Sequence, residues 1–212
     1  MTSSLEIQID SAGLSEIYGA SQSVTLALKV GQIVDAVASP KASAGGAGQL
    51  IVAWLAFAPL QTNTVTWSEQ YYCFATATPL TMGEVIKMNS QSAAPMQPGA
   101  IYTFANGQFS SHPASGSAYV VYNAMAGGYG FGLAQQATVN GGPAFAPTSV
   151  VPVLSNEAAY FTPADQISIF LSTASNNGTL IPPPINALTL AVDTARAVVG
   201  FNDQTHSFFQ LS

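Results

Sequence analysis

Apolar and polar residues alternate along several short stretches of this chain, which is the period of a β-strand with one buried face. Leu5-Glu6-Ile7-Gln8-Ile9 is the first such stretch, and residues 24–30 repeat the pattern with valine or leucine at every second position. Further strands are predicted at residues 83–88, 118–123, 127–132, 150–154, 166–171, 188–192, 197–201 and 208–211.

Two other stretches predict strands of a different kind. Residues 50–57 are an unbroken apolar run that is too short to cross a bilayer. They favour a strand buried on both faces, with a buried helix as the alternative. Residues 64–75 predict either a bent pair of strands or one long bulged strand. Residues 100–109 predict a hairpin, because the central Asn106-Gly107 tolerates the positive φ angles of a type I′ turn.

Helix and loop signals are few. Residues 10–19 suggest one short helical turn, and residues 39–48, rich in alanine, serine and glycine, predict a flexible loop. The segment 193–196 could join the last two long strands in a hairpin. The pattern as a whole therefore predicts an all-β fold, with residues 1–212 as a single-domain, mostly antiparallel two-sheet β-sandwich with little or no helix.

Charge is scarce in this sequence. Only 14 of the 212 residues are charged: 10 acids and 4 bases, giving a net charge of −6. Nucleic acids and anionic membranes bind clustered Lys and Arg, which this chain lacks. No integral membrane segment is expected, and the N-terminus has no signal-peptide pattern, so a cytoplasmic location is expected. Because titratable groups are few, we expect no enzyme and no catalytic residues.

The cysteine and the two histidines change this picture little. Cys73 lies in an apolar run and is expected to be a buried, inert thiol. His112 and His206 show none of the spacings typical of zinc sites. No metal and no cofactor are therefore expected.

The segment from Tyr119 to Asn140 has the most distinctive chemistry, because it combines aromatic rings, glycines and amides. Alternation places Tyr119 and Val121 on one strand face and Tyr122 on the other. Aromatic rings beside amides suit neutral polar ligands such as sugars; the alternative is that these rings fill the core. The predicted ligand-binding residues are Tyr119, Tyr122, Asn123, Tyr129, Phe131 and Trp67.

Three functions fit these features. The first is a non-enzymatic binding protein with lectin-like recognition of a neutral glycan or a similar neutral ligand. The second is a carrier of a small apolar ligand or pigment between the sheets. The third is a membrane-lytic, pore-forming β protein. Few charges protect the edge strands, so a homo-oligomer, most simply a homodimer, is expected.

A resemblance to known proteins supports the same fold class. Five short motifs resemble those of small all-β proteins from fungi and soil bacteria that have no assigned activity. These motifs are Thr66-Trp67-Ser68, Tyr71-Tyr72, Gly83-Glu84-Val85, Pro98-Gly99 and Asn106-Gly107. In composition the chain is also similar to cytosolic fungal lectins and cytolysins, which are charge-poor, Ser/Thr-rich β-sandwiches.

Overall fold

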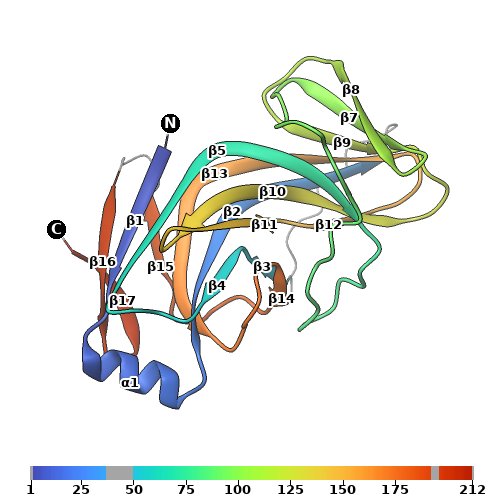
Figure 1. The fold of residues 1–212 in the computed structure, drawn as a ribbon. Coiled ribbons are helices and arrows are strands. Elements are labelled where there is room, and N and C mark those ends of the chain that lie inside the picture. Colours follow the sequence, from blue (N-terminus) through green and yellow to red (C-terminus); the bar gives the residue numbers. More distant parts are fainter. Residues whose placement is uncertain (1, 37–49, 192–195, 212) are drawn as a thin grey trace.

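Two large mixed β-sheets pack together in a sandwich-like arrangement, which confirms the predicted fold class (Figure 1). The computed structural model describes residues 2–36, 50–191 and 196–211. The predicted loop at 39–48 lies outside these residues. Most strand pairs are antiparallel, and two pairs, β1 with β16 and β7 with β9, are parallel. Among the described residues no helix has the length and apolar character needed to cross a membrane.

The first sheet contains both termini of the described chain. Its longest strand pair is β5 with β10, and β1 lies on the other side of β5. Its order is β11 (Gly142–Pro147), β10 (Tyr129–Val139), β5 (Thr62–Thr76), β1 (Thr2–Gln8), β16 (Ala197–Asn202) and β17 (Ser207–Leu211), with β12 (Val151–Val153) also on β10 and β6 (Ser90–Gln91) on β5.

The second sheet is organised around β13. The order of its strands is β4 (Leu55–Phe57), β2 (Ser23–Ala36), β13 (Glu157–Ser172), β9 (Tyr119–Asn123), β7 (Ala100–Ala105) and β8 (Gln108–Pro113), with β15 (Leu188–Ala191) also on β13. A small third sheet, which pairs β3 (Ile51–Ala53) with β14 (Thr179–Ile181), covers part of the first sheet.

A two-residue insertion interrupts the central strand of each large sheet. On β5 the chain takes four steps from Trp67 to Tyr71, while its partner β10 takes two, from Ala137 to Gln135. On β13 the four steps from 163 to 167 face two steps of β2. Because two extra residues preserve the period of a strand, the same set of alternating residues faces the interior on both sides of each bulge.

The interior consists of two main clusters, one on each side of the bulges. The first gathers Trp54, Trp67 and Phe201 with aliphatic residues between α1 and the bulges. The second gathers Phe104, Phe131 and other rings between the bulges and the β7–β8 hairpin. Full burial of one such large side chain contributes about 1.5–3 kcal/mol, so these clusters supply much of the stability.

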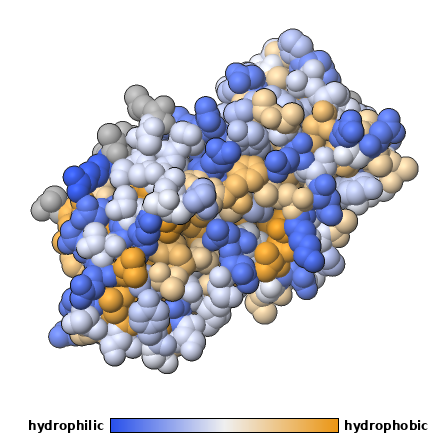
Figure 2. All heavy atoms as spheres, viewed as in Figure 1, coloured by the Kyte–Doolittle hydropathy of each residue, from blue (hydrophilic) through white to orange (hydrophobic). Residues whose placement is uncertain are grey.

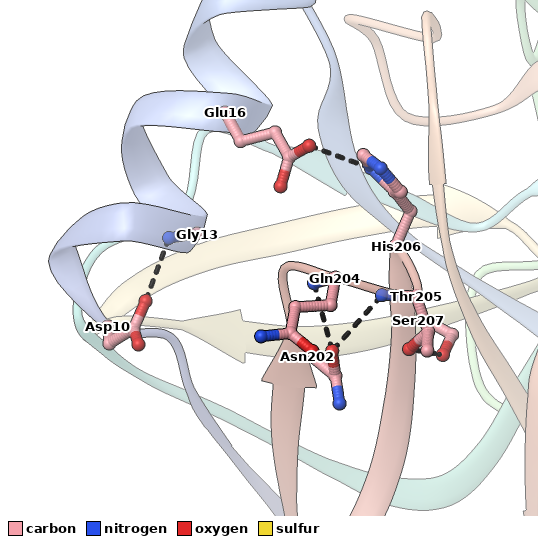
Figure 3. A network of polar contacts seen from close by, with 8 residues as sticks. All are labelled: Asp10, Gly13, Glu16, Asn202, Gln204, Thr205, His206 and Ser207. Carbon is pink, nitrogen blue, oxygen red and sulfur yellow. Dashed lines mark hydrogen bonds and ion pairs between the residues drawn. The ribbon is translucent and has the colours of Figure 1, made fainter.

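The helix α1 (Ser11–Gly19) closes one end of the sandwich and is longer than the single turn that the sequence suggested. The Asp10 side chain caps it by accepting from the backbone N–H of Gly13 at 2.8 Å. In the second half of the helix, Oε1 of Glu16 lies 2.9 Å from Nδ1 of His206, which belongs to the turn between β16 and β17 (Figure 3). Asn202 stabilises that turn by accepting from two backbone N–H groups.

Three sequence predictions need correction. The apolar run 50–57 is two short strands rather than one, because the chain breaks at Trp54 and its halves pair in different sheets. Residues 83–88 form only an isolated bridge from Val85 to Thr179. The N–H groups of Gly83 and Ile86 donate to Leu180 and Gly178, whereas that of Glu84 turns back to Thr81, so no longer ladder forms. The strands β15 and β16 do not form a hairpin, because β15 pairs with β13 and β16 pairs with β1 and β17.

Two of the three Asn-Gly dipeptides form tight hairpins, of which the sequence analysis recognised one. Asn106 and Gly107 have φ angles of 51° and 77°, which confirms the predicted turn. Asn140 and Gly141, with 50° and 82°, form a second hairpin that joins β10 to β11. The sequence analysis did not predict β11, β14 or the first half of β13. For residues 64–75 it allowed either a pair of strands or one bulged strand, and the structure has the single bulged strand β5.

Replacing Gly132 with alanine is expected to destabilise the protein by about 3 kcal/mol, measured by urea unfolding. A methyl group there would collide with the backbone oxygen of Ser149 and lie 2.7 Å from the Phe74 ring. Gly19→Ala is the matched control, because nothing lies within 4 Å of a methyl group at that position. If both variants unfolded at the same urea concentration, the packing at Gly132 would be looser than described.

Candidate functional site

A groove with an uncharged lining lies on the first sheet, where β5, β10 and β11 meet the start of β1. It measures about 550 Å³, which is in the range of small-ligand sites. We call it the hydroxyl groove. Its lining consists of Thr2, Thr66, Trp67, Ser68, Gln136, Ala137, Thr138, Pro143, Ala144 and Phe145.

Cross-strand pairing explains why hydroxyl groups gather in this groove. Thr66 pairs with Thr138, and Ser68 pairs with Thr2 at the start of the first strand. These residues alternate with the inward-facing Val65 and Trp67, so their side chains point to the outer face of the sheet. Three strands distant in sequence thus contribute hydroxyls to one surface.

An amide and an aromatic ring complete the groove. The second hairpin places Phe145 directly opposite Gln136, which is exposed. The ring of Tyr72 meets the Phe145 ring edge to face, with centroids 5.3 Å apart. Phe145 also packs against a buried cluster that includes Phe74 and Leu180. The ring is therefore held firmly on one side while the side facing the groove stays half exposed.

The predicted residues Tyr119, Asn123, Tyr129 and Phe131 lie mainly in the interior of the sandwich, away from this groove. Phe131 is fully buried, and its ring and that of Tyr129 pack against Phe104 at 5.4 and 5.6 Å. The half-buried Tyr119 faces inward and meets Tyr71 at 5.4 Å between ring centroids. These contacts match the alternative in which the rings of this segment fill the core.

Asn123 holds a turn together. It is fully buried, its Nδ2 donates to the carbonyls of Gly127 and Val153, and its Oδ1 accepts from the N–H of Met125. Every polar group of its amide except one lone pair of the oxygen is therefore engaged within the protein.

The two remaining predicted residues lie in different sheets. Tyr122 is half-buried on the outside of the second sheet, where its hydroxyl donates to Oδ1 of Asn156 at 3.2 Å. Trp67 lines the hydroxyl groove, although only 6 % of its surface is exposed. Its ring points inward and meets Trp54 at 5.7 Å. Of the six predicted residues, Trp67 alone belongs to the groove.

The sequence contained one signal for the rest of the groove. Asn140-Gly141 repeats the Asn-Gly signature of the first hairpin, and recognising it would have placed Phe145 opposite Gln136. The hydroxyl residues at positions 2, 66, 68 and 138 carried no comparable signal, because threonine and serine are frequent throughout the chain.

The groove offers hydrogen bonds and stacking rather than proton transfer. No residue of its lining is ionisable, and in the described part of the chain no three His, Cys, Asp or Glu residues gather as metal ligands would. On the face drawn in Figure 2, hydrophobic residues lie between hydrophilic ones. A void beside Trp67 and Ile167, between the sheets, measures only about 10 Å³.

Comparison with known proteins found no matching family model, curated protein or solved structure.

The two strongest pKa shifts belong to buried groups on β5. Burial raises the pKa of Cys73 to about 12, and the thiol is fully inaccessible, in agreement with the predicted inert cysteine. Burial also raises the pKa of the Tyr71 hydroxyl, and the negative charges of Glu69 and Asp165 add to this shift. Both groups therefore stay protonated and neutral across the physiological range.

These shifts predict that the protein loses stability in alkali. In the unfolded chain Cys73 ionises near its ordinary pKa of 9, whereas in the folded protein it stays neutral up to about 12. Stability from this group is therefore constant below pH 9 and falls as the pH rises from 9 towards 12. We expect the urea midpoint to drop between pH 8 and 10.5, and to drop less in Cys73→Ala.

The same burial predicts that the thiol is unreactive towards a disulfide reagent at pH 8 until urea unfolds the chain. Rapid modification of the folded protein would contradict the burial described for Cys73.

Proposed function

We propose that this protein is a non-enzymatic binding protein that recognises neutral glycans in the hydroxyl groove. The observation that carries this proposal is the lining of the groove, which combines four hydroxyl side chains, one exposed amide and one aromatic ring with no charge. Hydroxyl and amide groups both donate and accept hydrogen bonds, as the hydroxyls of a sugar do.

The positions of these groups support recognition of a pyranose ring. Phe145 offers an apolar surface against which the C–H face of a sugar packs, and Tyr72 holds the Phe145 ring in place. Gln136, directly opposite Phe145, offers an amide to the ring hydroxyls. The volume of about 550 Å³ is in the range of small-ligand sites and has room for a small saccharide.

The other two hypotheses find less support. A carrier of an apolar ligand needs space between the sheets, and at the one position beside Trp67 and Ile167 the void of about 10 Å³ has room for about one water molecule. A lytic protein needs strands that leave the sandwich, whereas β5 and β13 are paired with partners along most of their length.

Removing the amide of the groove is expected to weaken glycan binding. Screening an array of neutral glycans identifies a ligand, and calorimetry then compares variants. Gln136→Ala loses one or two neutral hydrogen bonds and should raise Kd roughly two- to tenfold for each. Phe145→Leu, which keeps the apolar contact below but removes the ring, should raise Kd by a similar factor.

The control for these variants is Gln204→Ala, since Gln204 is an exposed amide in the turn between β16 and β17, outside the groove lining. Its affinity should equal that of the unaltered protein. Absence of binding to every neutral glycan on the array, or equal losses in Gln204→Ala and Gln136→Ala, would refute the proposed function.

We also propose that the protein forms homodimers through the edge strand β8. In the described part of the chain this strand pairs only with β7, carries no acid, lysine or arginine, and is exposed apart from the half-buried Phe109. The edge strand β11 is better protected, because Pro143 and Pro147 cannot donate to a neighbouring strand, whereas β8 has a proline only at its last position.

A charge on β8 should therefore shift the protein towards monomers. Ser111→Lys is expected to lower the average mass measured by sedimentation at 100 µM or below, while the same change at the exposed Ser15 of α1 leaves it unchanged. A protein that is monomeric before substitution would rule out this dimer.

A further inference from the structure

A second groove opens on the first sheet, where the end of β1 meets β16 and β17 (Figure 1). It measures about 380 Å³, and we call it the amide groove. Its lining includes Gln8, Asp10, Gln61, Thr62, Gly200 and Phe209. Like the hydroxyl groove, it combines amides, a hydroxyl group and an aromatic ring, and it adds one carboxylate, that of Asp10.

The ring of Phe209 is placed by the glycine beside it. Gly200 pairs with Gln8 on β1 and with Phe209 on β17, so it separates the amide from the ring. A methyl group on Gly200 would lie 2.6 Å from the tip of the Phe209 ring, so the ring leans over the glycine towards β1. Phe209 is nevertheless 42 % exposed. An aromatic ring thus stays accessible near an amide, as Phe145 does opposite Gln136.

The pairing of β1 with β5 places both grooves on one face of the sheet. Thr2 pairs with Ser68 in the hydroxyl groove. Gln8 pairs with Thr62 in the amide groove, and the register between the two pairs is continuous. The two pairs are an even number of residues apart on both strands, so all four side chains point to the same side. The six steps from Thr2 to Gln8, at about 3.4 Å each, separate the two pairs by about 20 Å.

The surface between the grooves carries short polar side chains and one ion pair. Ser4 pairs with Thr66, and Glu6 pairs with Thr64, all at outward-facing positions that are exposed or half-buried. The carboxylate of Glu6 lies 2.6 Å from the guanidinium of Arg196. A neutral ligand that crosses this strip therefore meets hydroxyl groups and a charge that is already compensated.

We propose that the hydroxyl groove and the amide groove are two contact sites for one linear neutral polysaccharide, which runs along β1 and β5 from Phe145 to Phe209. The inference rests on the proposed function, and it narrows the ligand to a chain of several sugar residues. Two weak contacts with one polymer reinforce each other, because binding in the first groove holds the rest of the chain near the second. A disaccharide is too short to reach both grooves.

Calorimetry with neutral oligosaccharides tests this inference. Cello-, laminari-, malto-, manno- and chito-oligosaccharides are each compared as the disaccharide and the hexasaccharide. In a series that binds, we expect the Kd of the hexasaccharide to be at least about tenfold lower than that of the disaccharide. A longer chain also offers more positions to a single groove, so a variant in the amide groove must separate the contribution of the second site.

That variant is Phe209→Leu, which keeps an apolar side chain beside Gly200 and removes the ring. The Kd of the hexasaccharide should rise about three- to tenfold, whereas that of the disaccharide, which reports on the hydroxyl groove, should stay unchanged. Phe145→Leu should raise both values. Tyr160→Leu removes an exposed ring from β13 of the second sheet and, as the matched control, should change neither.

Because Phe209 also packs on Gly200, Gln61→Ala gives a second readout that leaves this packing intact. It should raise the Kd of the hexasaccharide about two- to tenfold and leave that of the disaccharide unchanged. A hexasaccharide Kd that neither variant alters would overturn the inference, while glycan binding in the hydroxyl groove would stand. Absence of binding in all five series would also contradict it, and the glycan array then decides whether the proposed function fails as well.

Discussion

The fold depends on two long strands that run through both clusters of the interior while keeping a single alternation of inward and outward residues. β5 and β13 each span the sandwich, and each contains two extra residues near its middle. A single extra residue would have turned one half of each strand inside out. Two extra residues instead place Glu69 and Asp165 in solvent at the bulges, so these acids are not buried between the sheets.

This alternation also decides which predicted residues could form a surface. The sequence correctly separated Tyr119 and Val121 from Tyr122, because strand period is a local property. Which of the two faces is buried is not local, since it depends on the sheet that packs above. For β9 the inward face holds Tyr119 and Asn123. The aromatic and amide residues predicted between Tyr119 and Phe131 therefore lie mainly in the core.

The remaining differences between sequence and structure have the same origin. The run 50–57 is uniformly apolar, and nothing in it marks Trp54 as the point where the chain leaves one sheet for another. The first half of β13 is a strand because β2 and β9 lie on either side of it. By contrast, the turn at Asn106-Gly107 and the buried Cys73 were predictable, because turn geometry and an apolar neighbourhood are properties of a few adjacent residues.

The hydroxyl groove occupies the part of the first sheet that the small third sheet leaves uncovered. If the hydroxyl groove served solubility alone, lysine and glutamate would be more effective there than serine and threonine. A ligand that covers a long charged side chain must desolvate it and immobilise it, at a cost of up to about 2 kcal/mol in side-chain entropy alone. Serine and threonine cost far less than lysine or glutamate, both in desolvation and in side-chain entropy. A surface of short hydroxyl side chains therefore costs little to cover with a neutral polar ligand, as the proposed glycan binding requires.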